Sequence, residues 1–170
     1  MNEIFKKIDG FENYSVSDHG KVRNDKTGRI LKPCKNHDGY LLICLMKENK
    51  KFSKLIHKLM AHAFLVNPEN KNCIDHIDND RQNNNLINLR VATNRQNSQN
   101  AKLSSKNTSG TKGVSWVDTR QRWRAQICVN RKIINLGYFI NKDDAINIRT
   151  QRAKDEFGEF INKCELILNV

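Results

Sequence analysis

The side chains of this sequence best suited to chemistry are Asp75, His76 and Asn97. A histidine gains and loses a proton near neutral pH, so His76 is suited to take a proton from a water molecule. Carboxylate and amide oxygens, such as those of Asp75 and Asn97, are the ligands that a hard divalent cation prefers. Together, a base and a cation could hydrolyse a phosphodiester, because the attacking water must lose a proton and the phosphoryl and leaving oxygens need nearby positive charge.

The elements around Asp75 and His76 predict a site built on two short strands. We expect a strand over Cys73 to Asp75, a long polar loop over residues 77–88 and a second strand over Leu89 to Ala92. Strand alternation would place Asp75 and His76 on opposite faces unless the strand ends between them. One side could then hold a cation and the other a water.

A helix after the second strand would bring Asn97 toward the same site. Thr93 and Gln96 satisfy the capping-box pattern, which predicts a helix over residues 94–101. Asn97 lies one helical turn after Thr93, so its side chain can project back toward the strand pair as a second oxygen ligand. A magnesium ion with only two protein ligands would keep several waters and bind phosphate oxygens readily.

The chain ahead of this site predicts a small module made mostly of β-strands. The expected strands lie at residues 14–16, 21–23, 29–32 and 40–46. Apolar residues then recur at helical spacing from Phe52 to Phe64, which predicts an amphipathic helix that ends near Asn67 and Pro68.

After the site, the polar residues 101–112 show no hydrophobic period and are expected to form a flexible linker. Beyond it, three strands are expected at residues 113–117, 123–129 and 132–138, the last two joined by a tight turn. A helix is expected from Asn141, its N-cap, to Phe157, with Gly158 as its stop. The residues expected to pack together beneath this helix are Trp123, Phe139, Ala145, Ile148 and Phe157.

Composition restricts the possible partners and compartments. The formal net charge of +12 suits a polyanion, because each phosphate that is neutralised releases counterions; DNA, RNA and an anionic membrane surface all stay open. The five cysteines include no C-x-x-C pair, which argues against a disulfide framework and a zinc ribbon. We see no leader and no run near the ~20 apolar residues of a membrane span, so we expect an intracellular, cytoplasmic protein that is not secreted.

The order of Asp75-His76, Asn88 and Asn97 resembles the motif of the HNH nucleases, and among them the homing endonucleases of phages and mobile introns. The resemblance implies a ββα-metal fold encoded by a phage, virus or mobile element. In that fold Asp75 and Asn97 would hold the cation, His76 would be the general base, and Asn88 would pin the loop through backbone hydrogen bonds. Asparagine at the last motif position favours Mg²⁺ or Mn²⁺ over the softer zinc.

Segments on both sides resemble modules that accompany such nucleases. The Gly, Tyr and Pro pattern over residues 8–40 is similar to the nuclease-associated modular (NUMOD-type) domain, although Phe5 replaces its usual tryptophan. Residues 109–158 resemble the Apetala-type (AP2/ERF-like) DNA-binding domain, which implies that a three-stranded sheet lies in the major groove. The base-reading candidates are Trp116, Arg122, Arg124, Gln126 and Arg131, and the lysines expected to touch phosphates are Lys102, Lys106 and Lys112.

Several other polar residues have plainer interpretations. His57 is expected to be structural or to contact phosphate, since it lies on the predicted amphipathic helix. Asp78 and Asp80 are expected to form loop turns. Asn100 is expected to be exposed to solvent.

The sequence therefore predicts an α+β, multi-module protein with a β-rich N-terminal module, a ββα-metal unit and a three-stranded antiparallel sheet packed on one helix. The expected modules are residues 1–48, 49–100, 113–160 and a tail at 161–170, with the linker at 101–112. The expected activity is metal-dependent hydrolysis of duplex DNA by a monomer or weak dimer that nicks and leaves 5′-phosphate and 3′-hydroxyl ends, with no protein partner evident. Two alternatives stay open: a DNA-binding regulator that does not cut, and a zinc finger or RNA binder, which lacks cysteine-histidine ligand spacing.

Overall fold

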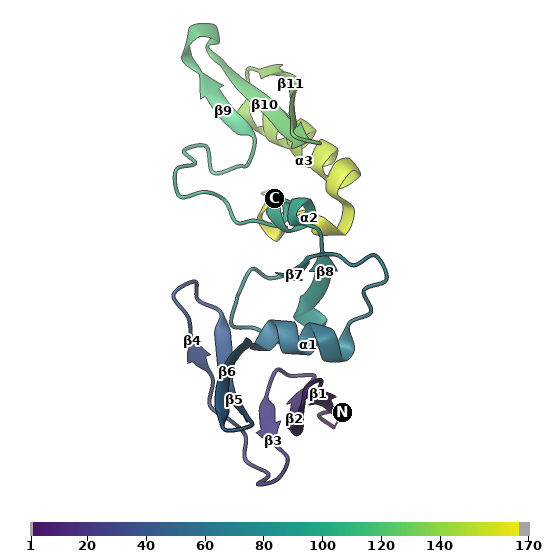
Figure 1. Ribbon diagram of the computed structural model, residues 1–170. Helices are drawn as coiled ribbons and strands as arrows, with labels where there is room; N and C mark the ends of the chain where they lie inside the picture. The colour runs from purple at the N-terminus through teal and green to yellow at the C-terminus, as the bar shows by residue number, and fades with distance from the viewer. Residues whose placement is uncertain (1, 167–170) are drawn as a thin grey trace. The chain divides into compact units, whose positions relative to one another are not determined.

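The structure, a computed structural model, describes residues 2–166, and the chain divides into two compact units between Asn97 and Ser98. Figure 1 shows the elements of each unit, which are described separately below. In the described part of the chain, no helix combines the length and the apolar character that crossing a bilayer requires.

The first unit holds three small antiparallel sheets and the helix α1 (Figure 1). The first two sheets are formed by β1 (Phe5–Ile8), β2 (Phe11–Ser17) and β3 (Val22–Asn24), and by β4 (Cys34–Lys35), β5 (Leu41–Lys47) and β6 (Lys50–Leu55). The remaining elements of this unit are α1 (Ile56–Phe64), the strand pair β7 (Cys73–His76) and β8 (Leu89–Ala92), the 3-10 turn Leu86–Asn88, and α2 (Asn94–Gln99), which begins here.

One hydrophobic core joins these elements. Helix α1 buries Ile56 and Met60 because they lie four positions apart on one face, and the helix contacts β1, β2, β5, β6, β7 and β8. The same core contains Val16 and Leu45 from the N-terminal sheets and Leu89 from β8. The N-terminal sheets and the β7–β8 region therefore bury apolar side chains in the same core.

The helix expected from Phe52 begins later than the sequence predicts. Residues Lys50–Leu55 form strand β6, which pairs with β5 across a two-residue turn at Glu48 and Asn49. Both turn residues have positive φ, 49° and 59°, which matches the right-handed twist of a tight hairpin. The expectation of a helix over residues 52–55 was wrong because the hairpin satisfies their backbone groups instead.

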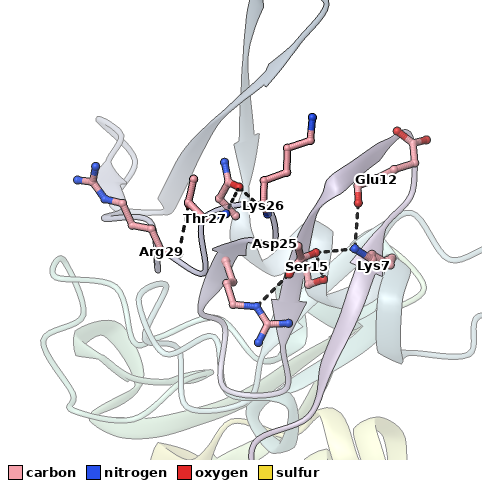
Figure 2. A network of polar contacts seen from close by, with 9 residues as sticks. Lys7, Glu12, Ser15, Asp25, Lys26, Thr27 and Arg29 are labelled. Atoms are coloured by element: carbon pink, nitrogen blue, oxygen red, sulfur yellow. Dashed lines mark hydrogen bonds and ion pairs between the residues drawn. The ribbon is translucent and has the colours of Figure 1, made fainter.

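A polar network ties the three strands of the first sheet together (Figure 2). Lys7 of β1, Ser15 of β2 and Arg23 of β3 are register partners across the sheet, so their side chains share one face. All three donate to the carboxylate of Asp25, at 2.8 Å from Lys7 Nζ, 2.5 Å from Ser15 Oγ and 2.9 Å from Arg23 Nε.

The second unit confirms the predicted order of three strands and one helix. An antiparallel sheet in the order β11-β10-β9 is formed by β9 (Val114–Val117), β10 (Arg122–Val129) and β11 (Lys132–Phe139), and α3 (Lys142–Phe157) packs on it (Figure 1). The turn Asn130–Arg131 has positive φ at both residues. Asn141 and Gly158 occupy the expected cap positions of the helix, although the Asn141 side chain makes no capping hydrogen bond. Short 3-10 turns lie at Asp118–Arg120, Gly158–Phe160 and Lys163–Glu165.

The helix-facing side of this sheet carries most of the predicted core. Trp123, Phe139 and Ala145 pack together with Val114 and Ala125, and Phe157 packs with Ile127 in a second cluster. The prediction for Ile148 was wrong, because its side chain is 44% exposed while its neighbour Arg149 is buried.

Residues 101–112 contain no helix or strand, but hydrogen bonds attach them to the second unit. The Ser109 hydroxyl is buried and donates to the carbonyl oxygen of Val114 at 2.6 Å. Asn100 was expected to be exposed, yet it is 1% exposed and its backbone oxygen accepts from Asn162 Nδ2. The polar composition of this segment therefore reflects internal hydrogen bonding as well as contact with solvent.

Candidate active site

Asp75 and His76 are the last two residues of β7, which pairs antiparallel with β8. Both side chains are buried, with exposed fractions of 4% and 5%. In the register of the pair, Asp75 lies opposite Arg90 and His76 opposite Leu89. The strand pair therefore fixes the backbone of both residues before the polar loop begins.

The Asp75 carboxylate is held by a buried ion pair across the strands. Arg90 donates to Asp75 Oδ2 through Nε at 2.9 Å and through its NH2 nitrogen at 2.8 Å. Two nitrogens of the guanidinium converge on this one oxygen, and such charge-assisted contacts hold Oδ2 in place. The guanidinium also supplies the positive charge that a buried carboxylate needs.

The His76 imidazole is fixed by a hydrogen bond and by neighbouring rings. Its Nε2 lies 3.2 Å from Asn84 Oδ1, and its centroid lies 5.3 Å from that of His57 and 5.9 Å from that of Tyr40. Burial lowers the pKa of His76 below 6.5, although the Asn84 hydrogen bond and nearby carboxylates oppose the shift. Burial thus favours the neutral form of the His76 imidazole.

The tautomer of His76 follows from the orientation of Asn84. Asn84 Nδ2 donates to the carbonyl oxygen of Gln82 at 3.2 Å, so Oδ1 is the atom that faces His76. An amide oxygen can only accept, so Nε2 carries the imidazole proton and Nδ1 carries the lone pair. Nδ1 is thus the basic atom of this ring.

Side chains at both ends hold the loop between the two strands. Asn88 Oδ1 accepts from the Asp78 backbone N–H at 3.0 Å, and Asn88 Nδ2 donates to the backbone oxygen of Asn83 at 2.8 Å. Asp78 also accepts from the backbone N–H of Asp80 and from the amide of Asn83, which confirms its expected role as a turn former. Burial raises the pKa of Asp78, but these hydrogen bonds outweigh burial and lower it overall.

The helix α2 begins with the predicted capping box. Gln96 Oε1 accepts from the Thr93 backbone N–H at 2.8 Å, and Thr93 Oγ1 accepts from the Gln96 backbone N–H at 3.2 Å. The Asn97 backbone N–H bonds the Thr93 carbonyl at 2.9 Å, and the Asn97 side chain is exposed. Asn97 is thus held on the first turn of a helix that directly follows β8.

Four residues near Asp75 and His76 were not singled out for this site from the sequence: Tyr40, His57, Asn84 and Arg90. Arg90 was detectable, because the two predicted strands place it directly opposite Asp75. Asn84 was obscured by the asparagine run from 83 to 85. Tyr40 and His57 come from other elements, and no local pattern marks their approach to His76.

In the second unit, the candidate base-reading residues do not all share one face. The face of β10 opposite the core carries every second residue of the strand, among them Arg122, Arg124 and Gln126. Arg131 is exposed in the following turn. Trp116 pairs directly with Trp123, and the two rings lie 5.3 Å apart, so Trp116 lies on the helix side of the sheet. The sheet register therefore separates it from the arginines.

The three candidate phosphate-contacting lysines also differ in their surroundings. Lys102 and Lys106 are exposed. Lys112 Nζ donates to Glu165 Oε1 at 3.0 Å and to the backbone oxygen of Gln99 at 3.2 Å. Its side chain is only 18% exposed, so this ammonium is engaged within the protein rather than directed into solvent.

Comparison with known families matches two segments of the chain. Residues 3–46 match the NUMOD4 motif, and residues 55–99 match the HNH endonuclease family. The chain therefore carries a segment that matches HNH endonucleases behind a segment that matches the NUMOD4 motif, and Asp75, His76, Asn88 and Asn97 all lie within the first of these.

Curated relatives come from viruses and phages. The chain is 38% identical over 90 residues to an uncharacterized HNH endonuclease, L245, of Acanthamoeba polyphaga mimivirus, which covers 53% of this chain and 27% of that protein. It is 37% identical over 97 residues to the DNA endonuclease I-HmuI of Bacillus phage SP01, covering 56% of each. The chain thus spans between about a quarter and about half the length of these two relatives.

A solved structure of the HNH homing endonuclease I-HmuI, whose subject is DNA binding and cleavage, is similar to this fold. The TM-score is 0.53 at 28% sequence identity, covering 91% of this chain and 83% of that one. The mixed α/β architecture of small sheets and few helices is therefore shared with a homing endonuclease.

Proposed function

We propose that this protein is a metal-dependent endonuclease that hydrolyses phosphodiester bonds in duplex DNA. The observation that carries the proposal is that Asp75 and His76, adjacent at the end of β7, are each held in place, the carboxylate by Arg90 and the imidazole by Asn84. A base and an anionic ligand in adjacent positions are what a one-metal hydrolysis of phosphate esters requires. The match of residues 55–99 to HNH endonucleases supports the same reaction.

His76 is suited to be the general base. Its neutral ring keeps a lone pair on Nδ1, while Nε2 is held by Asn84. A base must be unprotonated at the working pH and held in one orientation, and burial and the Asn84 bond meet these two conditions. His76 Nδ1 would take the proton of the attacking water.

Asp75 and Asn97 would hold the divalent cation. Their donor atoms are a carboxylate oxygen and an amide oxygen, which fit Mg²⁺ or Mn²⁺ better than zinc. The Arg90 pair on Oδ2 fixes the Asp75 carboxylate without changing its donor type. When bound, the cation supplies positive charge at the scissile phosphate.

The second unit would provide site selection on the DNA. Arg122, Arg124 and Gln126 on the open side of β10 suit guanine and adenine edges in the major groove, and Arg131 extends the same basic surface. Lys102 and Lys106 are exposed and suit phosphate contacts. An Apetala-type reading of DNA by this sheet is consistent with the overall charge of +12.

One such site per chain would cut one strand. A monomer should therefore nick duplex DNA, and the expected ends are 5′-phosphate and 3′-hydroxyl. The genome of a phage, virus or mobile element is the setting that the relatives suggest.

A plasmid assay tests the proposal. Supercoiled plasmid DNA that carries a sequence bound by the protein is incubated with it and either Mg²⁺ or EDTA. The open-circular product is followed on a gel. We expect nicking with Mg²⁺, none with EDTA, and at least about a thousandfold slower nicking by His76→Ala with DNA binding retained. His62→Ala is the matched control, because His62 is an exposed histidine of α1 whereas His76 is buried.

Two outcomes would reject the proposal. If the wild-type protein binds the plasmid but leaves it supercoiled in Mg²⁺ and in Mn²⁺, it is a DNA-binding regulator. If His76→Ala nicks as fast as His62→Ala, His76 is not the base.

A further inference from the structure

The loop that carries Asn84 is bonded to the N-terminal segment. The Leu86 backbone N–H donates to the backbone oxygen of Asp18 at 2.9 Å. Arg81 donates to the backbone oxygen of Asp38 at 2.6 Å, and its guanidinium lies 4.8 Å from the centroid of the Tyr40 ring. The loop between β7 and β8 therefore contacts two separate turns of residues 3–46.

Gly20 lies directly against Asn84. A Cβ at position 20 would lie 2.8 Å from Asn84 Cβ and 3.0 Å from the Asn84 backbone oxygen, so any larger residue would displace the asparagine. Gly20 also has a φ of +78°, which glycine adopts without strain. Asn84 is the residue that bonds His76 Nε2. The contact of Gly20 with Asn84 therefore bears on the position of the imidazole.

Tyr40 acts on the same ring from another side. Its ring lies 5.9 Å from the His76 centroid and 4.8 Å from that of His57, each at an interplanar angle of 44°. His57 completes the contact at 5.3 Å from His76. The imidazole is thus packed between an N-terminal aromatic ring, a helix α1 ring and the Asn84 amide.

We propose that the N-terminal segment, through Tyr40 and through Gly20 acting on Asn84, supplies positioning residues for His76. The proposal rests on the proposed nuclease function and adds a role for residues 3–46 within the active site. A shift of about 1 Å in a reacting group costs about a hundredfold in rate, so the segment would affect the cleavage step even without touching DNA. Tyr40 and Gly20 do not contact the reacting atoms and act through His76.

Matched glycine variants test the contact with Asn84. Gly20→Ala adds both positive-φ strain and a clash, whereas Gly28→Ala adds the strain alone, because φ at Gly28 is +70° and nothing lies within 4 Å of its added Cβ. We expect Gly20→Ala to slow single-turnover nicking about 10- to 100-fold with DNA affinity within about twofold of wild type. Gly28→Ala should nick at the wild-type rate.

A double-mutant cycle identifies the route of the effect. Asn84→Ala removes the hydrogen bond to His76, so adding Gly20→Ala to it should slow nicking by less than about threefold more. Two variants of Tyr40 give an independent test. Tyr40→Leu should slow nicking about tenfold, and Tyr40→Phe, which keeps the ring, should nick at the wild-type rate.

The ring signals of His76 in ¹H–¹³C NMR spectra provide a readout without catalysis. They should shift in Gly20→Ala and Tyr40→Leu and stay in place in Gly28→Ala. The proposal is overturned if both variants fold and cleave like the wild type, if rate and DNA affinity fall together, or if the His76 signals do not move. If the wild-type protein does not nick DNA at all, the proposed function fails, and the NMR shifts still decide whether the segment positions His76.

Discussion

His57 shows how burial can dominate the behaviour of a single residue. Its side chain is 5% exposed, and its Nδ1 is buried with no hydrogen-bond partner. Burial lowers the pKa of His57 to about 4, and the nearby His76 and Lys58 act in the same direction. An unpaired polar atom in a core is destabilising, so the buried Nδ1 lowers stability while the ring packs against His76.

This environment predicts an acid-sensitive loss of stability. An unfolded histidine binds a proton near pH 6.5 and folded His57 only near pH 4, so the unfolded state gains protons first and stability falls as pH drops from 6.5 to 4. His57→Phe keeps an aromatic ring and removes the titrating group. We expect its free energy of unfolding at pH 7 to equal or exceed that of the wild type by up to about 1 kcal/mol, and to fall less between pH 7 and 4.

Denaturant melts at pH 7, 5.5 and 4 measure both effects. His57→Ala is the control for packing: it should lose about 2 kcal/mol at pH 7 because it leaves a cavity, and, like His57→Phe, it should fall less than the wild type between pH 7 and pH 4 because it lacks the titrating ring. A wild-type protein whose stability is the same at pH 7 and pH 4 would contradict the burial of neutral His57.

At the scale of elements, the small sheet β1–β3 is held by a polar network in addition to its apolar core residues. Its strands have four, seven and three residues, and the Asp25 carboxylate gathers donors from all three (Figure 2). Charge-assisted hydrogen bonds of this kind are each stronger than neutral ones. The Asp25 carboxylate therefore links the three strands of the sheet.

The Asp25 network predicts a second loss of stability, at lower pH than the loss expected from His57. Burial raises the pKa of Asp25, but the bonds from Lys7, Ser15 and Arg23 outweigh it and lower the pKa to about 2 from 3.8. Its stabilisation is therefore complete above about pH 4 and is lost as pH falls toward 2. Asp25→Asn should cost about 1 to 2 kcal/mol at pH 7, and less as pH approaches 2, in urea melts followed by circular dichroism.

Lys26→Ala is the control for this prediction, because Lys26 is the next residue after Asp25 and its side chain extends away from the Asp25 carboxylate in Figure 2. It should unfold like the wild type at every pH. Equal stability of Asp25→Asn and the wild type at pH 7 would show that solvent screens the network.

Elements with a local signal were predictable from the sequence, and those defined by distant partners were not. The strand β8 and the capping box of α2 follow from alternation and from Thr93 and Gln96. Strand β6 was missed because its turn uses Glu48 and Asn49 at positive φ instead of glycine. In the site, Asp75 and His76 are adjacent in sequence, whereas the approach of Tyr40 depends on the folding of another segment.

At the scale of the whole molecule, each unit has its own core, and the second unit also has a buried ionic centre. Glu165 has a side chain that is 3% exposed, and its two oxygens lie 3.0 Å from Lys112 Nζ and 2.9 Å from an Arg149 nitrogen. Lys112 comes from the segment expected to be a linker and Arg149 from α3. One carboxylate near the end of the described chain therefore joins three parts of the unit.

Because Glu165 is the only carboxylate described in this ionic centre, we expect Glu165→Ala to destabilise the second unit selectively. Removing the carboxylate leaves the Arg149 guanidinium, 7% exposed, as an uncompensated buried charge, which costs about 3 kcal/mol or more. Both tryptophans, Trp116 and Trp123, lie in this unit, so fluorescence melts report on it alone. Hydrogen exchange should show lost protection in residues 98–166 and unchanged protection in residues 2–97.

Glu156→Ala is the matched control, since Glu156 pairs with Arg152 on the surface of α3 with side chains 24% and 43% exposed. Such a pair contributes about 0.5 kcal/mol, so the fluorescence midpoint should barely move. If Glu165→Ala melts like Glu156→Ala, the buried pair adds nothing. If both units lose protection together, the division of the chain after Asn97 does not describe its unfolding, because a local loss of charge balance would then have spread through a single cooperative structure.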